Sequence, residues 1–242
     1  FMNMKLRSEK KKGFTLIELL VVITIIGILA GIAIGPMGDI LFNTSKTAAS
    51  KNLKGMWDKI STNNGDLESF KWPGKETINS AQGFATWFTK KTAMDDAAIW
   101  FLSKDPILEE FDDGDGPKIP ERITNKEGSL DDVKDAFGYS MAVPPTRSRS
   151  IPESPSGPFP LMWTRGLESG ATEWSKESPW EGSGGHILFS NGKVEWYDNT
   201  EGEEQEGVFK TYREKGDDQD DTLTTDIKRA IPDDWEILQP DG

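Results

Sequence analysis

A single carboxylate inside a long apolar run is the first feature of the sequence that could do chemistry. The 22 residues from Phe14 to Gly35 contain one charged side chain, Glu18. An apolar run of about 20 residues is long enough to cross a bilayer as a helix, and a charge at mid-membrane depth costs roughly 2.5–3.5 kcal/mol. Glu18 lies nearer the basic end of the run, where the cost is lower, but its position still predicts a partner of opposite charge.

The charges on either side of this run are strongly unequal. Residues 1–13 carry five basic residues and one acidic residue, a net charge of +4, whereas residues 14–242 carry 23 basic and 40 acidic residues, a net charge of −17. Basic residues beside a membrane helix stay in the cytoplasm, so we expect the acidic body to be exported. Its negative charge also argues against nucleic acid as a partner, because phosphates would be repelled.

An ordinary cleaved signal peptide is the simplest alternative for this segment. Lysines followed by an apolar run fit it, and Gly31-Ile32-Ala33 offers small residues at a cleavage point. However, the run is longer than the roughly 7–15 residues of a typical signal core. A signal peptide would also gain nothing from Glu18. We therefore favour a helix that remains in the mature protein.

The residues around the start of the run resemble a known family. Lys12-Gly13-Phe14-Thr15-Leu16-Ile17-Glu18-Leu19 is similar to the signal of type IV pilins and type II secretion pseudopilins. The resemblance implies that a prepilin peptidase cuts after Gly13 and N-methylates Phe14. Cleavage would create an amine at Phe14, and Glu18 of a neighbouring subunit could pair with it. A buried pair attracts strongly while either charge alone is penalised, so Glu18 would set the register of assembly.

The same resemblance implies a structural function and no enzymatic activity. The expected partners are the prepilin peptidase, other pilin or pseudopilin subunits, an inner-membrane assembly platform and the membrane itself. The expected location is a single pass through the inner membrane with a periplasmic head, followed by incorporation into a pilus or pseudopilus filament. We expect no cofactor.

Glycines recur every four residues along the apolar run, at Gly27, Gly31 and Gly35. This spacing of small residues lets apolar helices approach closely, although glycine is also common in membrane helices generally. Pro36 follows at once and removes a helical hydrogen bond. In pilin filaments such a stretch is often unwound, and Gly31–Pro36 is the corresponding stretch here.

The expected fold class is α+β, with a long N-terminal helix packed on a head that contains a small antiparallel sheet, further helices and loops. We divide the chain into a leader at residues 1–13, a transmembrane helix at 14–35, an amphipathic continuation at 36–62 and an exported globular head at 63–242. The continuation has an apolar stripe at intervals of mostly three to five residues: Met37, Leu41, Thr44, Ala48, Leu53, Met56 and Ile60.

The clearest strand signal is a hairpin over residues 185–197. Asn191-Gly192 is the favoured dipeptide of a two-residue hairpin turn. That turn pairs Phe189 with Val194 and Ile187 with Trp196, which places these four side chains together on the core face. The same register places His186 opposite Tyr197.

Catalytic and metal-binding patterns are sparse. The chain has no cysteine and one histidine, His186, so a zinc site with several Cys or His ligands is excluded by count. A buried or solvent-facing structural role is the main interpretation of His186. Asp113 and Asp115, in a glycine-containing acidic stretch, are weak candidates for calcium, and a solvated acidic turn is the alternative.

The nine tryptophans leave one functional alternative open. Exposed in a row, they would form a stacking surface and favour an anchored glycan-binding or adhesive module that uses the pilin signal for export. Buried, they would favour a plain structural subunit. The positions of these rings therefore discriminate between the two functions.

Overall fold

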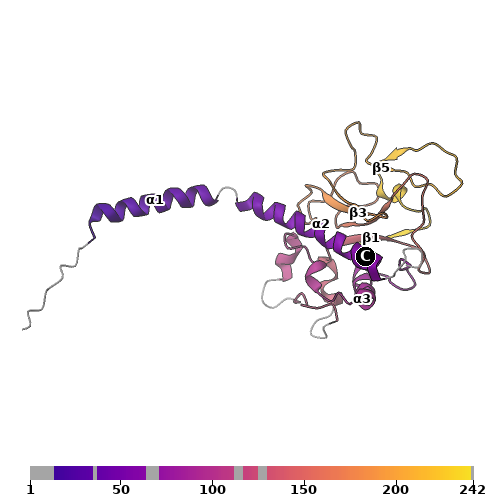
Figure 1. Ribbon diagram of the computed structural model, residues 1–242, viewed down its shortest axis with the longest axis horizontal. Helices are drawn as coiled ribbons and strands as arrows, with labels where there is room; N and C mark the ends of the chain where they lie inside the picture. The colour runs from indigo at the N-terminus through magenta and orange to yellow at the C-terminus, as the bar shows by residue number, and fades with distance from the viewer. Residues whose placement is uncertain (1–13, 35–36, 64–70, 112–116, 125–129, 241–242) are drawn as a thin grey trace, which may run out of the picture. The chain divides into compact units, whose positions relative to one another are not determined.

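The computed structural model describes residues 14–34, 37–63, 71–111, 117–124 and 130–240. Two helices begin the chain, α1 (Leu16–Ile34) and α2 (Met37–Asn63). The chain divides into two compact units, residues 1–41 and residues 42–242, and the second contains most of α2 and the whole head. The combination of helices with an antiparallel sheet confirms the α+β fold class (Figure 1).

One side of α2 is buried in the head. Its buried positions are Ser45, Ala49, Leu53, Met56, Trp57 and Ile60. The second half of the expected stripe is thus confirmed, but Thr44 and Ala48 are exposed and the true stripe is displaced by one residue in the first half. The displacement has a physical reason, because the Trp180 indole donates a hydrogen bond of 2.8 Å to the Ser45 hydroxyl and so makes burial of a polar residue favourable.

The head is built on a five-stranded antiparallel sheet with the strand order β4-β3-β2-β1-β7. Its strands are β1 (Tyr139–Val143), β2 (Pro160–Thr164), β3 (Gly185–Phe189), β4 (Val194–Tyr197) and β7 (Glu236–Leu238). The inner strands β1, β2 and β3 are buried on both faces. The C-terminal strand β7 completes the sheet by pairing Ala142 with Ile237.

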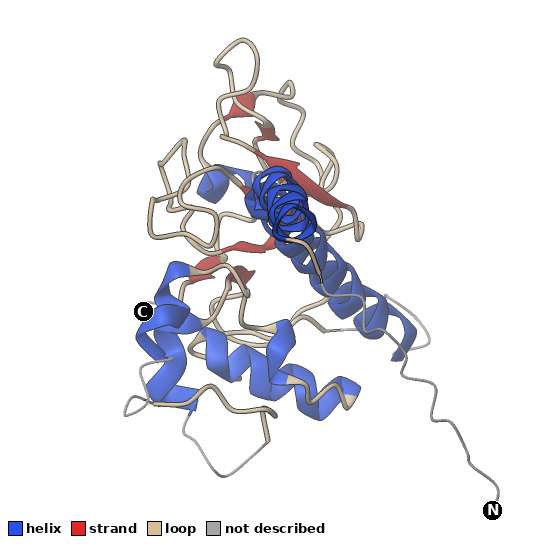
Figure 2. Ribbon diagram, turned by 90° about the vertical axis from the view of Figure 1, so that its left-hand side faces the viewer, coloured by secondary structure: helices blue, strands red, loops and turns tan. Residues whose placement is uncertain are grey.

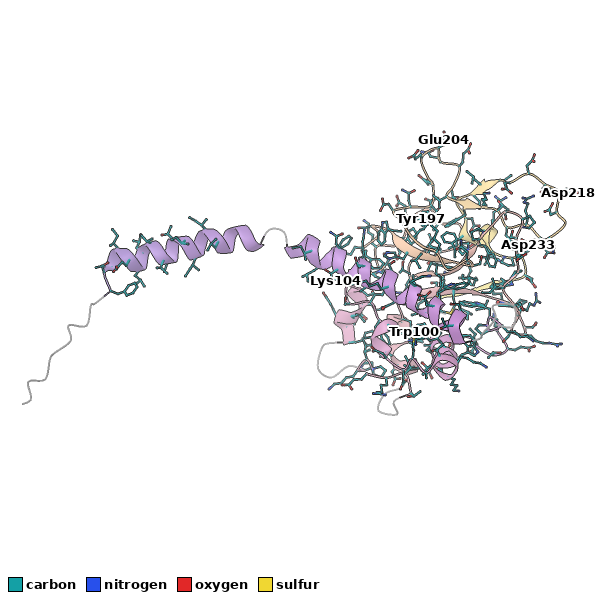
Figure 3. The ribbon with its side chains drawn as sticks, in the orientation of Figure 1. Trp100, Lys104, Tyr197, Glu204, Asp218 and Asp233 are labelled. Carbon is teal, nitrogen blue, oxygen red and sulfur yellow. The ribbon has the colours of Figure 1, made fainter. Side chains whose placement is uncertain are left out.

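Short helices and a two-stranded ribbon cover this sheet. The helices are α3 (Ala81–Thr92), η1 (Ala97–Ile99), η2 (Pro106–Phe111), η3 (Leu130–Ala136) and η4 (Ile227–Ala230), and the ribbon consists of β5 (Phe209–Lys210) and β6 (Leu223–Thr224). Figure 1 shows α3 below the sheet and β5 above it, and Figure 2 shows a group of blue helices below the red strands. Trp100, labelled in Figure 3, is fully buried between α3 and β1, where its ring contacts Phe88 and Tyr139.

The hairpin of β3 and β4 forms, but the expected register is wrong by one residue. Leu188 pairs with Val194, and His186 pairs with Trp196. The turn has three residues, since Phe189 accepts from the amide of Gly192 and donates to the carbonyl of Lys193. Consequently Ile187 and Phe189 do not share a face with Val194 and Trp196.

A contact with α2 explains the longer turn. Gly192 has φ of +81° and packs directly against the indole of Trp57, while Lys54 Nζ donates to the Gly192 carbonyl at 3.4 Å. A three-residue turn requires one residue in the left-handed region, and Gly192 takes that place. The tertiary contact thus overrides the local preference of Asn-Gly for a two-residue turn.

Substitution of Gly192 tests this contact. Gly192→Ala is expected to lower the free energy of unfolding by about 1–3 kcal/mol more than Gly157→Ala does. Both glycines have positive φ, but a methyl group at Gly192 would overlap Trp57, whereas nothing lies within 4 Å of the corresponding position at Gly157. Denaturant titration of the two variants measures the difference, and equal losses would show that strain in the turn, without packing, explains the effect.

Candidate functional site

The start of α1 holds the carboxylate that the sequence singles out. The Glu18 carboxylate accepts hydrogen bonds from the Thr15 amide at 2.8 Å and from the Thr15 hydroxyl at 2.6 Å, both at Oε2. In return, the Glu18 amide donates to the Thr15 hydroxyl at 3.3 Å. This reciprocal arrangement is a capping box, which satisfies amide groups at the start of a helix that have no partner within the helix.

Thr15 is the residue of this site that sequence reasoning missed. The sequence led us to expect a partner for Glu18 only on a neighbouring subunit, whereas in the structure its carboxylate is already held by Thr15, three positions earlier in the same chain. The signal was present, because Thr15-Leu16-Ile17-Glu18 has the threonine and glutamate spacing of a capping box. The cap fixes the carboxylate at the helix start, four positions after Phe14, whose side chain is 78% exposed.

The remainder of α1 is apolar on every side. Its described large apolar side chains, from Leu16 to Leu29, are between 44% and 82% exposed. A helix with no polar face is usually covered by other apolar groups in its working state. We therefore expect the exposed apolar surface of α1 to be buried against other apolar groups in the working state of the protein.

By length and hydropathy, no helix within the described residues qualifies as a membrane span.

Gly27 and Gly31 lie on α1 with open space beside them, since nothing lies within 4 Å of the position where a side chain would begin. They are thus accessible to another helix. Residues 31–34 are helical here.

Gly13, Gly35 and Pro36 lie outside the described residues, as do Asp113 and Asp115. Within the described residues no group of three or more potential ligands is placed to hold a metal ion.

Aromatic rings dock α2 on the hairpin of the head. Trp180, His186 and Trp196 lie edge to face, with ring centroids 4.9–5.6 Å apart. The ammonium of Lys46 on α2 lies 3.4 Å from the centroid of Trp196, a cation–π contact. His186 is therefore a buried packing residue whose ring lies against the indoles of Trp180 and Trp196.

The environment of His186 predicts a pH effect. Burial, with a smaller contribution from the Lys46 ammonium, lowers the pKa of the His186 imidazole to about 4 from 6.5. The unfolded chain takes up a proton below about 6.5 while the folded chain does not. The free energy of unfolding should therefore fall as the pH drops from about 6.5 to 4, by up to about 3 kcal/mol from this group.

Denaturation at pH 7 and pH 4.5 of wild type and His186→Phe measures this contribution, because carboxylate titration is common to both chains. The loss on acidification is expected to be smaller in His186→Phe. An equal loss in the two proteins would show that His186 does not carry the pH dependence.

Most of the tryptophans are core residues. Seven of the nine are buried: Trp57, Trp72, Trp100, Trp163, Trp174, Trp180 and Trp235. Trp87 and Trp196 are partly exposed and come from different elements, α3 and β4. The tryptophans therefore do not form an exposed row.

Comparison with known proteins agrees with the resemblance found in the sequence. Residues 9–34 match the family model of the prokaryotic N-terminal methylation motif. Two curated proteins of Pseudomonas aeruginosa, each called a fimbrial protein, are 39% identical to the chain over 91 residues, which cover 36% of this chain and 54% of each relative. The chain thus spans about half the length of the curated relatives it matches. No solved structure matches it.

The motif and the fimbrial relatives together support a type IV pilin-like family for this chain. The α+β architecture, with its helical N-terminus and antiparallel sheet, is consistent with a pilin-like fold. The resemblance that the N-terminal residues suggested is thereby confirmed.

Proposed function

We propose that the chain is a structural subunit that a prepilin peptidase cuts after Gly13 and that assembles through its first helix into a type IV pilus or a type II secretion pseudopilus. The observation that carries the proposal is the methylation motif over residues 9–34 with Glu18 in the first turn of α1. The same peptidase would N-methylate Phe14. The protein acts by assembly and carries out no catalysis.

The capping box suggests how the site functions. Both hydrogen bonds from Thr15 end on Oε2 of Glu18, so we assign Oε1 to the amine of Phe14 on a neighbouring subunit. Cleavage creates that amine, and a bundle of apolar helices would exclude water from the pair. In such a medium the paired charges attract strongly, and either one alone is penalised. The cap would present the carboxylate in a fixed geometry before the partner arrives.

The remaining parts of the chain fit the same function. The exposed apolar surface of α1 would lie in the inner membrane and later among the helices of neighbouring subunits. Gly27 and Gly31 would be the points where those helices approach α1 most closely. The basic residues before α1 would keep the leader in the cytoplasm and leave the acidic head outside it. The inner-membrane assembly platform would then transfer the subunit from the membrane to the filament.

The burial of seven tryptophans favours a structural subunit over a head that is primarily a glycan-binding module. Large rings that fill the core stabilise the head and leave no extended stacking surface.

Substitution at the cleavage point tests the proposal. Gly13→Leu, co-expressed with a prepilin peptidase, should remain at full length in the membrane, because the residue before the cut is altered. Gly55→Leu, a glycine on α2 with open space around it, serves as a matched control and should be cut normally. Normal cleavage of Gly13→Leu would contradict the proposed processing.

A further inference from the structure

A hollow on the head lies between α3 and η3, well apart in sequence from the assembly site. It has a volume of about 570 Å³, and its lining includes Asn79, Gln82, Thr86, Trp87, Lys90 and Asp131. Ligand sites commonly measure about 300–1,000 Å³. The hollow is thus large enough for a small organic ligand and too small for a folded partner.

Trp87 supplies a flat apolar surface to this hollow. Its ring is partly exposed and rests on buried Phe84, with ring centroids 5.5 Å apart. Phe84 is itself held by Trp72 at 5.2 Å and by Trp100 at 5.9 Å. An aromatic ring fixed in this way loses little freedom when a ligand stacks on it.

Apart from Gly83, Ile123 and Leu130, the remaining lining is polar and has little net charge. Gln82 Nε2 donates to Asp131 Oδ1 at 3.2 Å, which ties α3 to η3 and fixes a planar amide and a carboxylate at the edge of the hollow. Asn79 and Thr86 add further hydrogen-bonding groups, and the charge of Lys90 offsets that of Asp131. Such a site favours a ligand with many hydroxyl groups and no charge.

We propose that this hollow binds a neutral oligosaccharide of two or three rings, with one sugar stacked on Trp87. A sugar ring has an apolar face of C–H groups that suits an indole, and an edge of hydroxyl groups that suits Asn79, Gln82 and Asp131. The subunit would then carry a carbohydrate-recognition site in addition to its assembly site. Sugar binding at this hollow requires neither cleavage nor filament formation.

The experiment uses the full chain in lipid nanodiscs, because detergents with maltose or glucose head groups would compete for the site. The tryptophans are labelled with 5-fluorotryptophan, and the Trp87 signal in the fluorine NMR spectrum is assigned by its loss in Trp87→Phe. Chitotriose, cellotriose and maltotriose are each titrated to about 10 mM, which detects affinities in the millimolar range.

At least one trisaccharide should shift the Trp87 signal. Binding, followed by calorimetry, should weaken roughly tenfold in Trp87→Ala, which corresponds to a loss of about 1.4 kcal/mol of stacking free energy. Asn79→Ala, an exposed change that should not disturb folding, should weaken binding several-fold. Trp196→Phe, at the other partly exposed indole, should bind as wild type does. No shift with any of the three sugars, or equal binding by Trp87→Ala, would overturn the proposal.

Discussion

Glu18→Val is expected to yield a mature, membrane-bound protein that is scarcely incorporated into filaments. Removal of a charge from an apolar helix makes insertion easier, so export and cleavage after Gly13 should proceed. Assembly should fail because the amine of Phe14 on the next subunit would enter the helical bundle without a carboxylate. An unpaired buried charge costs roughly 3–5 kcal/mol. Sheared filament and membrane fractions, compared by immunoblotting, measure the distribution.

Two further variants separate the charge of Glu18 from its capping role. Glu18→Gln keeps an oxygen that can accept the hydrogen bonds of Thr15 but loses the charge, so it should also assemble poorly. Thr15→Val removes the hydroxyl group of the cap but keeps the carboxylate, so it should assemble much better than Glu18→Gln does. Filaments that contain Glu18→Val or Glu18→Gln at wild-type levels would refute the charge pair and leave the processing claim intact.

Arg165→Leu is expected to be the most destabilising single change in the head. Arg165 and Asp105 form an ion pair in which both side chains are buried, and Arg165 Nη2 also donates to the Glu177 carbonyl at 2.8 Å. Loss of the guanidinium leaves a buried carboxylate without its cation, which costs about 3–5 kcal/mol. The midpoint of thermal unfolding, followed by circular dichroism, should drop clearly.

The double variant Arg165→Leu/Asp105→Asn provides the control. In the native protein, the Ile107 amide donates a hydrogen bond of 3.3 Å to Asp105 Oδ1. Asparagine removes the charge but keeps an oxygen that can accept this hydrogen bond. If the uncompensated charge causes the loss, the double variant should recover a substantial part of the stability. A double variant as unstable as Arg165→Leu would show that lost packing explains the effect.

Local patterns in the sequence predicted the parts of the fold that depend on local chemistry. The apolar positions Leu53, Met56 and Ile60 follow helical spacing and are buried as expected. Residues 185–197 form a hairpin because apolar residues flank an Asn-Gly dipeptide.

The errors arose where distant residues meet. The turn register depends on Trp57, more than a hundred residues from Gly192, and burial of Ser45 depends on Trp180. The pairing of β7 with β1 likewise joins strands that are far apart in sequence, and no local pattern identifies such partners. The capping role of Thr15 is different, because its spacing from Glu18 was sufficient to predict it.

The N-terminus of the mature protein tests the central claim most directly. The wild-type chain would be co-expressed with a prepilin peptidase, isolated from the membrane and digested, and its N-terminal peptide identified by mass spectrometry. We expect a peptide that begins at Phe14 and carries one N-methyl group. A mature chain that begins after Ala33, as an ordinary signal peptide would give, or one that retains residues 1–13, would contradict the account.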